Sequence, residues 1–277
     1  MWLWWLVCLL EGTFLTQAFM TPLSPPSREG STLLEAKRGG TKAPHKCLEI
    51  ECLEESDYWK LEPALDILRA GGLGVIPVDS CYVFACDIHS RGGVEKIFTL
   101  KKFAAQKKPL SLLCNSISTI NQYTGGVDKS LFKRLKKALP GPYTLILPAT
   151  HEVPRVLLQH KAHKKTWKRR EIGVRMPDQP ICLKILQGLE SPLLCSSVPH
   201  ANASDEDEGE DDHTPVRDPV ELLTWKKNPK VDFIVDAGVV EPQPGFTSIG
   251  FSTVVDFMGP EPLVIREGLG DPSFLVE

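Results

Sequence analysis

Beyond an atypical N-terminal segment, short apolar runs alternate with amphipathic segments along the chain, and this alternation constrains the fold more than any other feature. Leu61, Leu65 and Leu68 recur at helical spacing. The apolar runs at residues 73–78 and 81–86 follow as buried strands. Helices and strands that alternate in this way pack as helices against a mostly mixed or parallel sheet. The sequence therefore predicts an α/β fold.

The same alternation continues toward the C-terminus without any internal repeat. Further strands are predicted at residues 110–114, 143–147, 172–176, 193–197, 233–236, 253–256 and 263–266, and further helices at residues 94–100, 130–138, 153–159, 179–189 and 219–223. With 277 residues, 42% hydrophobic, the chain can bury one sizeable core, in one large domain or two small ones. The net charge of −3 is small, so an anionic partner must meet a local basic surface.

The cysteines indicate packed, reduced thiols. There are 8 of them, and most lie inside the apolar runs that are predicted to be strands or buried helix faces. The spacing from Cys47 to Cys52 and from Cys81 to Cys86 leaves four residues between partners, and no zinc-like second pair follows. No protein metal site is therefore predicted.

The first 46 residues are expected to be a targeting leader. Residues 1–17 form an apolar stretch that resembles a signal peptide and is too short to span a membrane, so no stable membrane association is expected of the mature form. Residues 21–46 are basic and rich in Ser, Thr and Pro, as in a transit peptide. Together they predict a bipartite leader for import into a plastid bounded by extra membranes. Ordinary secretion and a misassigned start are the alternatives.

An acidic insertion interrupts the alternation at residues 203–214. Its acidic residues are Asp205, Glu206, Asp207, Glu208, Glu210, Asp211 and Asp212. Like charges in such a run repel one another and cannot pack, so the insertion is predicted to be a disordered surface loop. Mimicry of nucleic acid or binding of cations is the functional alternative.

Three local stretches resemble the YrdC-like family, whose fold is that of threonylcarbamoyl-adenylate synthases. Residues 72–82 (Gly-Leu-Gly-Val-Ile-Pro-Val-Asp-Ser-Cys-Tyr) resemble the strand-turn-strand with the family pattern Pro-Thr-Asp-Thr-x-Tyr. The second is Pro-Gly-Pro-Tyr-Thr at 140–144 with Gly-Val-Arg-Met-Pro at 173–177, and the third is Phe-Ser-Thr-Val-Val-Asp at 251–256 with Val-Ile-Arg-Glu-Gly at 264–268. The resemblance implies one domain over residues 57–270, with a twisted mixed sheet, helices on both faces and a concave basic groove.

The matching stretches imply a site for a nucleotide and a small carboxylate. The candidate binding residues are Ser80, Tyr82, Lys102, Thr144, Arg175, Ser197, Ser252 and Arg266. Hydroxyls at strand ends and fixed guanidinium groups are directional donors to anionic oxygens. Arg175 lies between apolar neighbours on a predicted strand, so its charge must meet a phosphate, a carboxylate or a structural aspartate such as Asp79 or Asp256.

In the family, threonine and bicarbonate form a carbamate whose oxygen attacks the α-phosphorus of ATP, and pyrophosphate leaves. This nucleotidyl transfer needs no covalent enzyme intermediate. Catalysis then rests on positioning and on neutralising the phosphates with Lys, Arg and the Mg²⁺ that accompanies ATP. No catalytic residue is therefore assigned, and ATP, threonine and Mg²⁺ are the ligands that the resemblance implies.

Three departures from the family pattern distinguish this chain. Ala104 stands where the family has the arginine of Lys-x-Arg, Val78 replaces a pocket threonine, and the chain keeps Ser197 but lacks the asparagine of Ser-x-Asn. Each lost donor costs about 1–3 kcal/mol where a ligand needs it. These stretches and residues 151–158 resemble the YciO-type branch more closely. The alternative function is a non-catalytic RNA-binding module with a degraded synthase pocket.

A basic segment at residues 160–170 predicts binding of double-stranded RNA or tRNA. The candidate residues are Lys164, Lys165, Trp167, Lys168, Arg169 and Arg170. Cations around an aromatic ring suit phosphate neutralisation and base stacking. Reading the shape of an RNA duplex needs little base-specific chemistry, so it is compatible with an altered pocket. A basic loop before the strand at 172–176 is the alternative.

Overall fold

The computed structural model describes residues 46–101, 110–162, 165–168, 170–200, 214–241 and 250–276. The chain divides into two units, residues 1–42 and 43–277, and all described residues belong to the second. The predicted leader lies outside the described residues except for Lys46, and the acidic insertion lies outside them except for Thr214. Both stay predictions.

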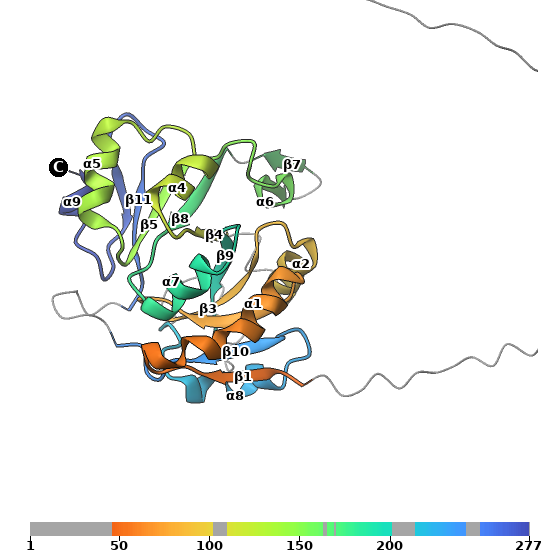
Figure 1. Cartoon of the computed structure of the whole chain (residues 1–277). Coiled ribbons are helices and arrows are strands. Elements are labelled where there is room, and N and C mark those ends of the chain that lie inside the picture. Colours follow the sequence, from red (N-terminus) through yellow and green to blue (C-terminus); the bar gives the residue numbers. More distant parts are fainter. Residues whose placement is uncertain are drawn as a thin grey trace, which may run out of the picture. The chain divides into compact units, whose positions relative to one another are not determined.

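One mixed sheet of ten strands organises the described residues (Figure 1). Its strands are β1 Leu48–Glu51, β2 Leu73–Pro77, β3 Tyr82–Asp87, β4 Ser111–Leu113, β5 Tyr143–Pro148, β8 Glu171–Arg175, β9 Leu193–Ser197, β10 Phe233–Asp236, β11 Thr253–Asp256 and β12 Leu263–Arg266. They lie in the order β1-β10-β2-β3-β9-β4-β8-β5-β11-β12. Parallel pairs such as β4 with β8 adjoin antiparallel pairs such as β4 with β9.

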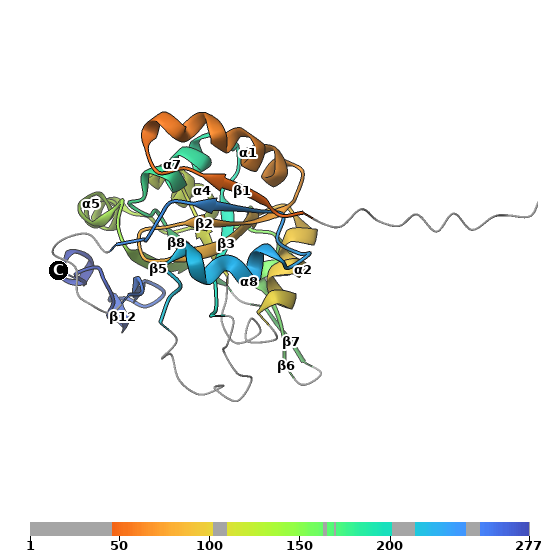
Figure 2. The ribbon, with the colours of Figure 1, turned by 90° about the horizontal axis from the view of Figure 1, so that it is seen from below.

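Helices cover both faces of this sheet. They are η1 Glu55–Leu61, α1 Glu62–Arg69, α2 Arg91–Leu100, α4 Ile117–Tyr123, α5 Lys129–Ala138, α6 Arg155–Leu158, α7 Pro180–Gln187, η2 Pro219–Leu222, α8 Leu223–Lys226 and α9 Ser273–Val276. In Figure 2, α1 and α7 lie above the strands β2 and β3, and α2 and α8 lie below them. The predicted mixed sheet with helices on both faces is confirmed.

Two apolar cores form because side chains of a strand point alternately to opposite faces. On β3, Phe84 and Cys86 belong to one core, and Val83 and Ala85 belong to the other. Every one of these side chains is fully buried, so β3 is a central strand with both faces covered. Residues 82–86 are therefore apolar without interruption.

The seven cysteines that the structure describes are all free and buried. They are Cys47, Cys52, Cys81, Cys86, Cys114, Cys182 and Cys195. They pack as apolar side chains in the two cores. The prediction of packed, reduced thiols is confirmed for these residues.

Some elements differ from the sequence-based expectation. Strand β1 was not predicted and precedes the first predicted element. It is a strand because it pairs with β10, and it has no continuous apolar run that would mark it in the sequence. The helix predicted at 153–159 is limited to α6, since Gln159 begins a hairpin of β6 Gln159–Ala162 and β7 Lys165–Lys168. The basic segment, for which a loop was the alternative interpretation, therefore contains paired strands. Among the described residues, no helix has the length and apolarity that a membrane span requires.

Candidate ligand-binding site

Small polar side chains lie on one face of the sheet where β4, β8 and β5 run side by side. Ser111 on β4 is in register with Gly173 on β8. A Cβ atom on Gly173 would lie 2.9 Å from Ser111 Oγ and 3.4 Å from Thr144 Cγ2, so these two side chains already occupy the space above the glycine. Arg175, two residues along β8, points to the same face.

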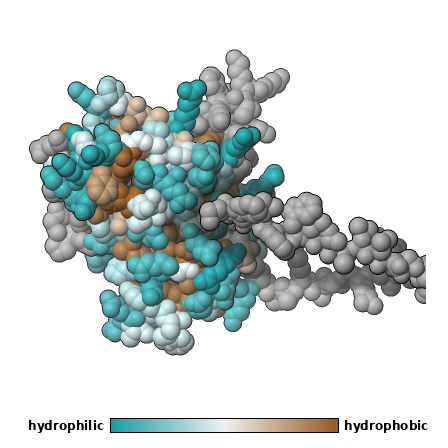
Figure 3. All heavy atoms as spheres, turned by 45° about the horizontal axis from the view of Figure 1, so that its top comes forward, coloured by the Kyte–Doolittle hydropathy of each residue, from teal (hydrophilic) through white to brown (hydrophobic). Residues whose placement is uncertain are grey.

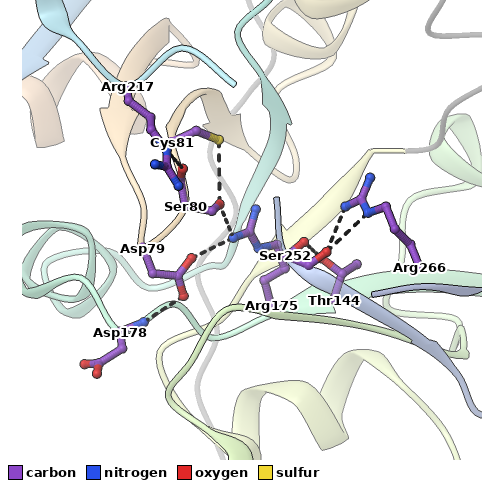
Figure 4. A network of polar contacts seen from close by, with 9 residues as sticks. All are labelled: Asp79, Ser80, Cys81, Thr144, Arg175, Asp178, Arg217, Ser252 and Arg266. Atoms are coloured by element: carbon purple, nitrogen blue, oxygen red, sulfur yellow. Dashed lines mark hydrogen bonds and ion pairs between the residues drawn. The ribbon is translucent and has the colours of Figure 1, made fainter. Parts of the chain in front are cut away.

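Arg175 is buried at the end of β8 against the turn that follows β2 (Figure 4). Its Nη2 donates to Asp79 Oδ1 over 2.8 Å and to Ser80 Oγ over 3.0 Å. The backbone N–H of Asp178 donates to the other Asp79 oxygen over 3.1 Å. The structural partner that the sequence predicted for Arg175 is therefore Asp79 and not Asp256, whose carboxylate accepts from the Met258 backbone.

Burial and pairing act in opposite directions on this ion pair. Burial raises the pKa of Asp79, while the Arg175 charge and the Asp178 N–H lower it. Burial also disfavours the Arg175 charge, but the Asp79 carboxylate raises the pKa of the guanidinium above its ordinary value. On balance both pKa values are raised, and Arg175 is the counter-charge that a buried Asp79 carboxylate needs.

A second set of polar side chains lies beside the Arg175–Asp79 pair in Figure 4. Thr144 Oγ1 and Ser252 Oγ are 2.8 Å apart, and one hydroxyl donates to the other. Arg266 donates to the Ser252 carbonyl from Nη2 over 2.9 Å and from Nε over 3.3 Å, with its guanidinium 5.0 Å from the centre of the Phe251 ring. The segment before β11 is thus tied to both neighbouring strands.

Arg217 is a site residue that the sequence-based analysis missed. Its Nε donates to the Ser80 carbonyl over 3.2 Å. The backbone positions it, because the Tyr82 N–H donates to the Val216 carbonyl over 2.8 Å and the Val240 N–H donates to the Arg217 carbonyl. No local pattern marks it, since these contacts join segments that are distant in the sequence.

Two buried N–H groups at this site have no hydrogen-bond partner among the residues that the structure describes. They are Nε of Arg175 and Nη2 of Arg217. A buried donor without an acceptor is costly, and it is a feature expected of a site whose acceptor is a ligand oxygen. Three arginines, three hydroxyls and a buried aspartate therefore form a cluster suited to anionic oxygens.

The other predicted binding residues lie elsewhere or outside the described part. Tyr82 is fully buried, with its hydroxyl donating to the Gly238 carbonyl and accepting from the Ala237 N–H. Ser197 ends β9 opposite Val83 of β3, and its partly exposed side chain has no hydrogen bond to the described residues. Lys102 is outside the described residues. Its neighbour Lys101 is described and donates to Ser196 Oγ over 2.7 Å.

The predicted RNA-binding residues are only partly described. Lys165, Trp167 and Lys168 belong to β7, whereas Lys164 and Arg169 fall outside the described residues. Arg170 is exposed just before β8. The role of these six residues in binding RNA stays a prediction.

The described cysteines do not provide a nucleophile at the site. Burial raises the pKa of Cys81, and it raises that of Cys195 to about 12, so both thiols stay protonated and unreactive near neutral pH. Within the described ranges, no group of three His, Cys, Asp or Glu side chains is arranged to hold a metal ion. The arrangement can bind and orient an anion, and we assign covalent catalysis to none of its residues.

The fold and the cluster define a mixed α/β domain with a polar sheet face that suits oxyanions. The family model Sua5_yciO_yrdC, described as "Telomere recombination", matches residues 66–268. The chain belongs to this Sua5/YciO/YrdC family.

The YciO protein of E. coli, compared in sequence and in structure, shows where the chain lies within that family. The chain is 32% identical over 213 residues to "Uncharacterized protein YciO" of Escherichia coli, covering 76% of this chain and 90% of the relative. The crystal structure of E. coli YciO superposes with a TM-score of 0.66 at 30% identity, over 83% of this chain and 98% of the other.

Threonylcarbamoyl-AMP synthases are more distant. That of Pyrococcus abyssi is 28% identical over 220 residues, covering 79% of this chain and 57% of the synthase. The structure of P. abyssi Sua5 complexed with L-threonine has a TM-score of 0.64 at 23% identity, over 80% of this chain and 57% of that one, and shows a shared fold. The predicted YciO-type resemblance is confirmed.

Proposed function

We propose that this chain binds ATP and a small amino acid, with threonine as the leading candidate, at the cluster of Ser80, Arg175, Arg217 and Ser252. One observation carries the proposal: within the described part of the chain, two buried guanidinium N–H groups lack acceptors at a hydroxyl-lined sheet face. Phosphate and carboxylate oxygens are the acceptors that guanidinium groups bind best. The threonine in the P. abyssi Sua5 complex supports this choice of amino acid.

Threonylcarbamoyl-AMP synthesis is the reaction proposed for this site. The threonine nitrogen joins bicarbonate to form a carbamate with loss of water, a carbamate oxygen then forms a bond to the α-phosphorus, and the bond to pyrophosphate breaks. Ser80 and the arginines would hold the anionic groups in line and balance charge that develops on the phosphates. Mg²⁺ would enter with ATP as part of that substrate.

The test uses protein that begins at Lys46, incubated with ATP, Mg²⁺, bicarbonate and threonine. Calorimetry measures binding of ATP and of threonine, and threonine-dependent pyrophosphate release measures the reaction. Arg217→Gln is the site variant, because it removes an N–H that has no acceptor among the described residues. Arg91→Gln is the matched control, since Arg91 is exposed and, among the described residues, pairs only with Glu95 on α2.

We expect Arg217→Gln to weaken ATP or threonine binding about tenfold or more, as loss of a charged hydrogen bond does, with Arg91→Gln unchanged. Equal affinities of both variants and of the unaltered protein would exclude Arg217 from the site. Ligand binding without pyrophosphate release would separate the binding function from synthase activity.

RNA binding is a second candidate function, favoured by the β6–β7 hairpin. Its β7 strand contains Lys165, Trp167 and Lys168 and pairs with β6 from Gln159 to Ala162. A two-stranded ribbon with cations and an aromatic can follow an RNA backbone. We expect RNA affinity that falls steeply with salt and falls further when Lys165 and Lys168 are changed to Gln. Affinity that does not depend on salt would contradict this role.

A further inference from the structure

Helix α5 has a strongly basic exposed face. Its ten residues include five cations and no acid, although the whole chain has a net charge of −3. Leu131, Leu135 and Ala138 are buried against the core, so the helix is fixed by one face. Lys129, Lys133 and Lys136 are exposed at successive helical turns on the remaining surface.

The lysines of this face have no ion-pair partners among the described residues, unlike the cations of other surface helices. Arg69 on α1 contacts Glu62 and Asp66, and Arg91 on α2 contacts Glu95, each over 3.0 Å. On α5, Lys129 and Lys133 are instead four residues apart and repel each other. Among the described residues, Arg134 is the α5 cation that donates a hydrogen bond, to the Leu275 carbonyl of α9. A solvated helix face gains nothing from such repulsion, whereas an anionic partner would relieve it.

An exposed aromatic ring lies among these lysines. Phe132 is 43% exposed, and the Lys136 ammonium lies 5.7 Å from the centre of its ring. Together with Ile117, Ser118 and Asn121 of α4, this ring lines a hollow between α4 and α5. In Figure 3, the upper left of the molecule, where α4 and α5 lie, shows brown apolar residues framed by teal hydrophilic ones.

We propose that the α4–α5 surface, defined by Lys129, Phe132, Lys133 and Lys136 with the α4 residues Ser118 and Asn121, binds RNA. The lysines neutralise phosphates, and Phe132 stacks on an unpaired base. Ser118 and Asn121 offer hydrogen bonds to the edge of that base. This inference rests on the RNA-binding function proposed above and assigns it a second surface besides the β6–β7 hairpin.

RNA fits this surface better than a membrane does. The apolar residues line a hollow, whereas a helix that lies on a bilayer presents a protruding apolar face. Asp128 precedes α5 and accepts from the Leu131 N–H, so it caps the helix and contributes one negative charge at the rim. The cations of α5 outnumber it.

The experiment measures binding of a fluorescein-labelled RNA stem–loop and of its fully paired duplex by fluorescence anisotropy. The test variant changes Lys129, Lys133 and Lys136 to Gln. The control variant removes three cations that already have acidic partners, through Lys60→Gln, Arg69→Gln and Arg91→Gln. Phe132→Leu separates stacking from charge. Thermal unfolding checks that every variant is folded.

We expect the α5 triple variant to bind both RNAs about tenfold or more weakly, with a shallower salt dependence, while the control triple variant does not change. Phe132→Leu should weaken stem–loop binding about fivefold or more and leave duplex binding unchanged. The α5 triple variant should unfold at the same or a higher temperature, because repulsion is removed.

Three outcomes would overturn the proposal. Binding lost only in the hairpin variant Lys165→Gln/Lys168→Gln would exclude the α4–α5 surface and leave RNA binding in place. Lack of RNA binding by the unaltered protein would overturn both proposals. Tighter, α5-dependent binding to phosphatidylserine vesicles than to either RNA would assign the surface to a membrane.

Discussion

Arg175 on β8 and Asp79 in the turn after β2 form a buried ion pair, with 2.8 Å between Nη2 and Oδ1. Their side chains are only 8% and 4% exposed, so neither charge is solvated. The pair joins β8 to the turn that follows β2, although β3, β9 and β4 lie between β2 and β8 in the sheet. It also fixes the Ser80 hydroxyl, which accepts from the same Arg175 nitrogen.

Removing one member of this pair should destabilise the domain strongly. Arg175→Ala leaves the Asp79 carboxylate buried without its counter-charge, and we expect the free energy of unfolding to fall by about 3–5 kcal/mol. Urea denaturation of Arg175→Met, of Asp79→Leu and of the double variant measures the coupling. The double variant should lose much less than the sum of the single losses. Additive losses would show that the two charges do not interact.

Gly173→Ala should be destabilising because of two named neighbours. The new methyl group would lie 2.9 Å from Ser111 Oγ, and we expect a loss of about 1–3 kcal/mol in the free energy of unfolding. Ser111→Gly removes the nearer atom, so the Ser111→Gly/Gly173→Ala double variant should recover part of the loss. If the double variant is no more stable than Gly173→Ala, this contact is not the cause.

Thr144→Val tests the hydroxyl pair beside β11. Valine has the shape of threonine but no hydroxyl, so Ser252 Oγ, 2.8 Å away, loses its partner inside the protein. We expect a loss of about 1 kcal/mol in stability. If Thr144 also contacts the ligand, ATP affinity should fall in Thr144→Val more than in Ser252→Ala, as measured by calorimetry. A greater fall in Ser252→Ala would assign the ligand contact to Ser252.

The stability of the domain should fall at alkaline pH. Burial raises the pKa of Cys86, Cys114 and Cys195 from 9.0 to about 12. Above pH 9 the unfolded chain releases these protons while the folded chain holds them, so the unfolded state is favoured as pH rises from 9 toward 12. Urea denaturation across this range should show the decline. Substitution of Cys114 by Ala should make the decline shallower, and an unchanged pH dependence would contradict it.

Local patterns predicted most of the sheet because its central strands are apolar on both faces. Residues 82–86 could be assigned to a strand from sequence alone, since Phe84 and its neighbours form a continuous apolar run. The Leu-Glu-Ile-Glu sequence of β1 has one buried side chain, Ile50, and its strand conformation depends on β10. A partner that is distant in the sequence leaves no local signal.

The site was predictable to the extent that its residues belong to family motifs. Ser80, Arg175 and Ser252 were expected together and lie in one cluster. Arg217 was not expected, because its place depends on the backbone bond between Tyr82 and Val216. The burial of Tyr82 was also not evident. The sequence pattern is the same whether this tyrosine lines a pocket or is buried with its hydroxyl bonded to the backbone.

The strand order has a consequence for the way in which this chain folds. Strand β10 is inserted between β1 and β2, with Phe233 beside Leu48 and Gly74, and β11 joins β5 through Thr253 and Tyr143. Closing such long loops is slow, because the entropy of closure is lost before the contacts form. The sheet cannot be completed until almost the whole chain has left the ribosome. Chains that end before β10 would expose β1 and β2 as open edges, which favour aggregation.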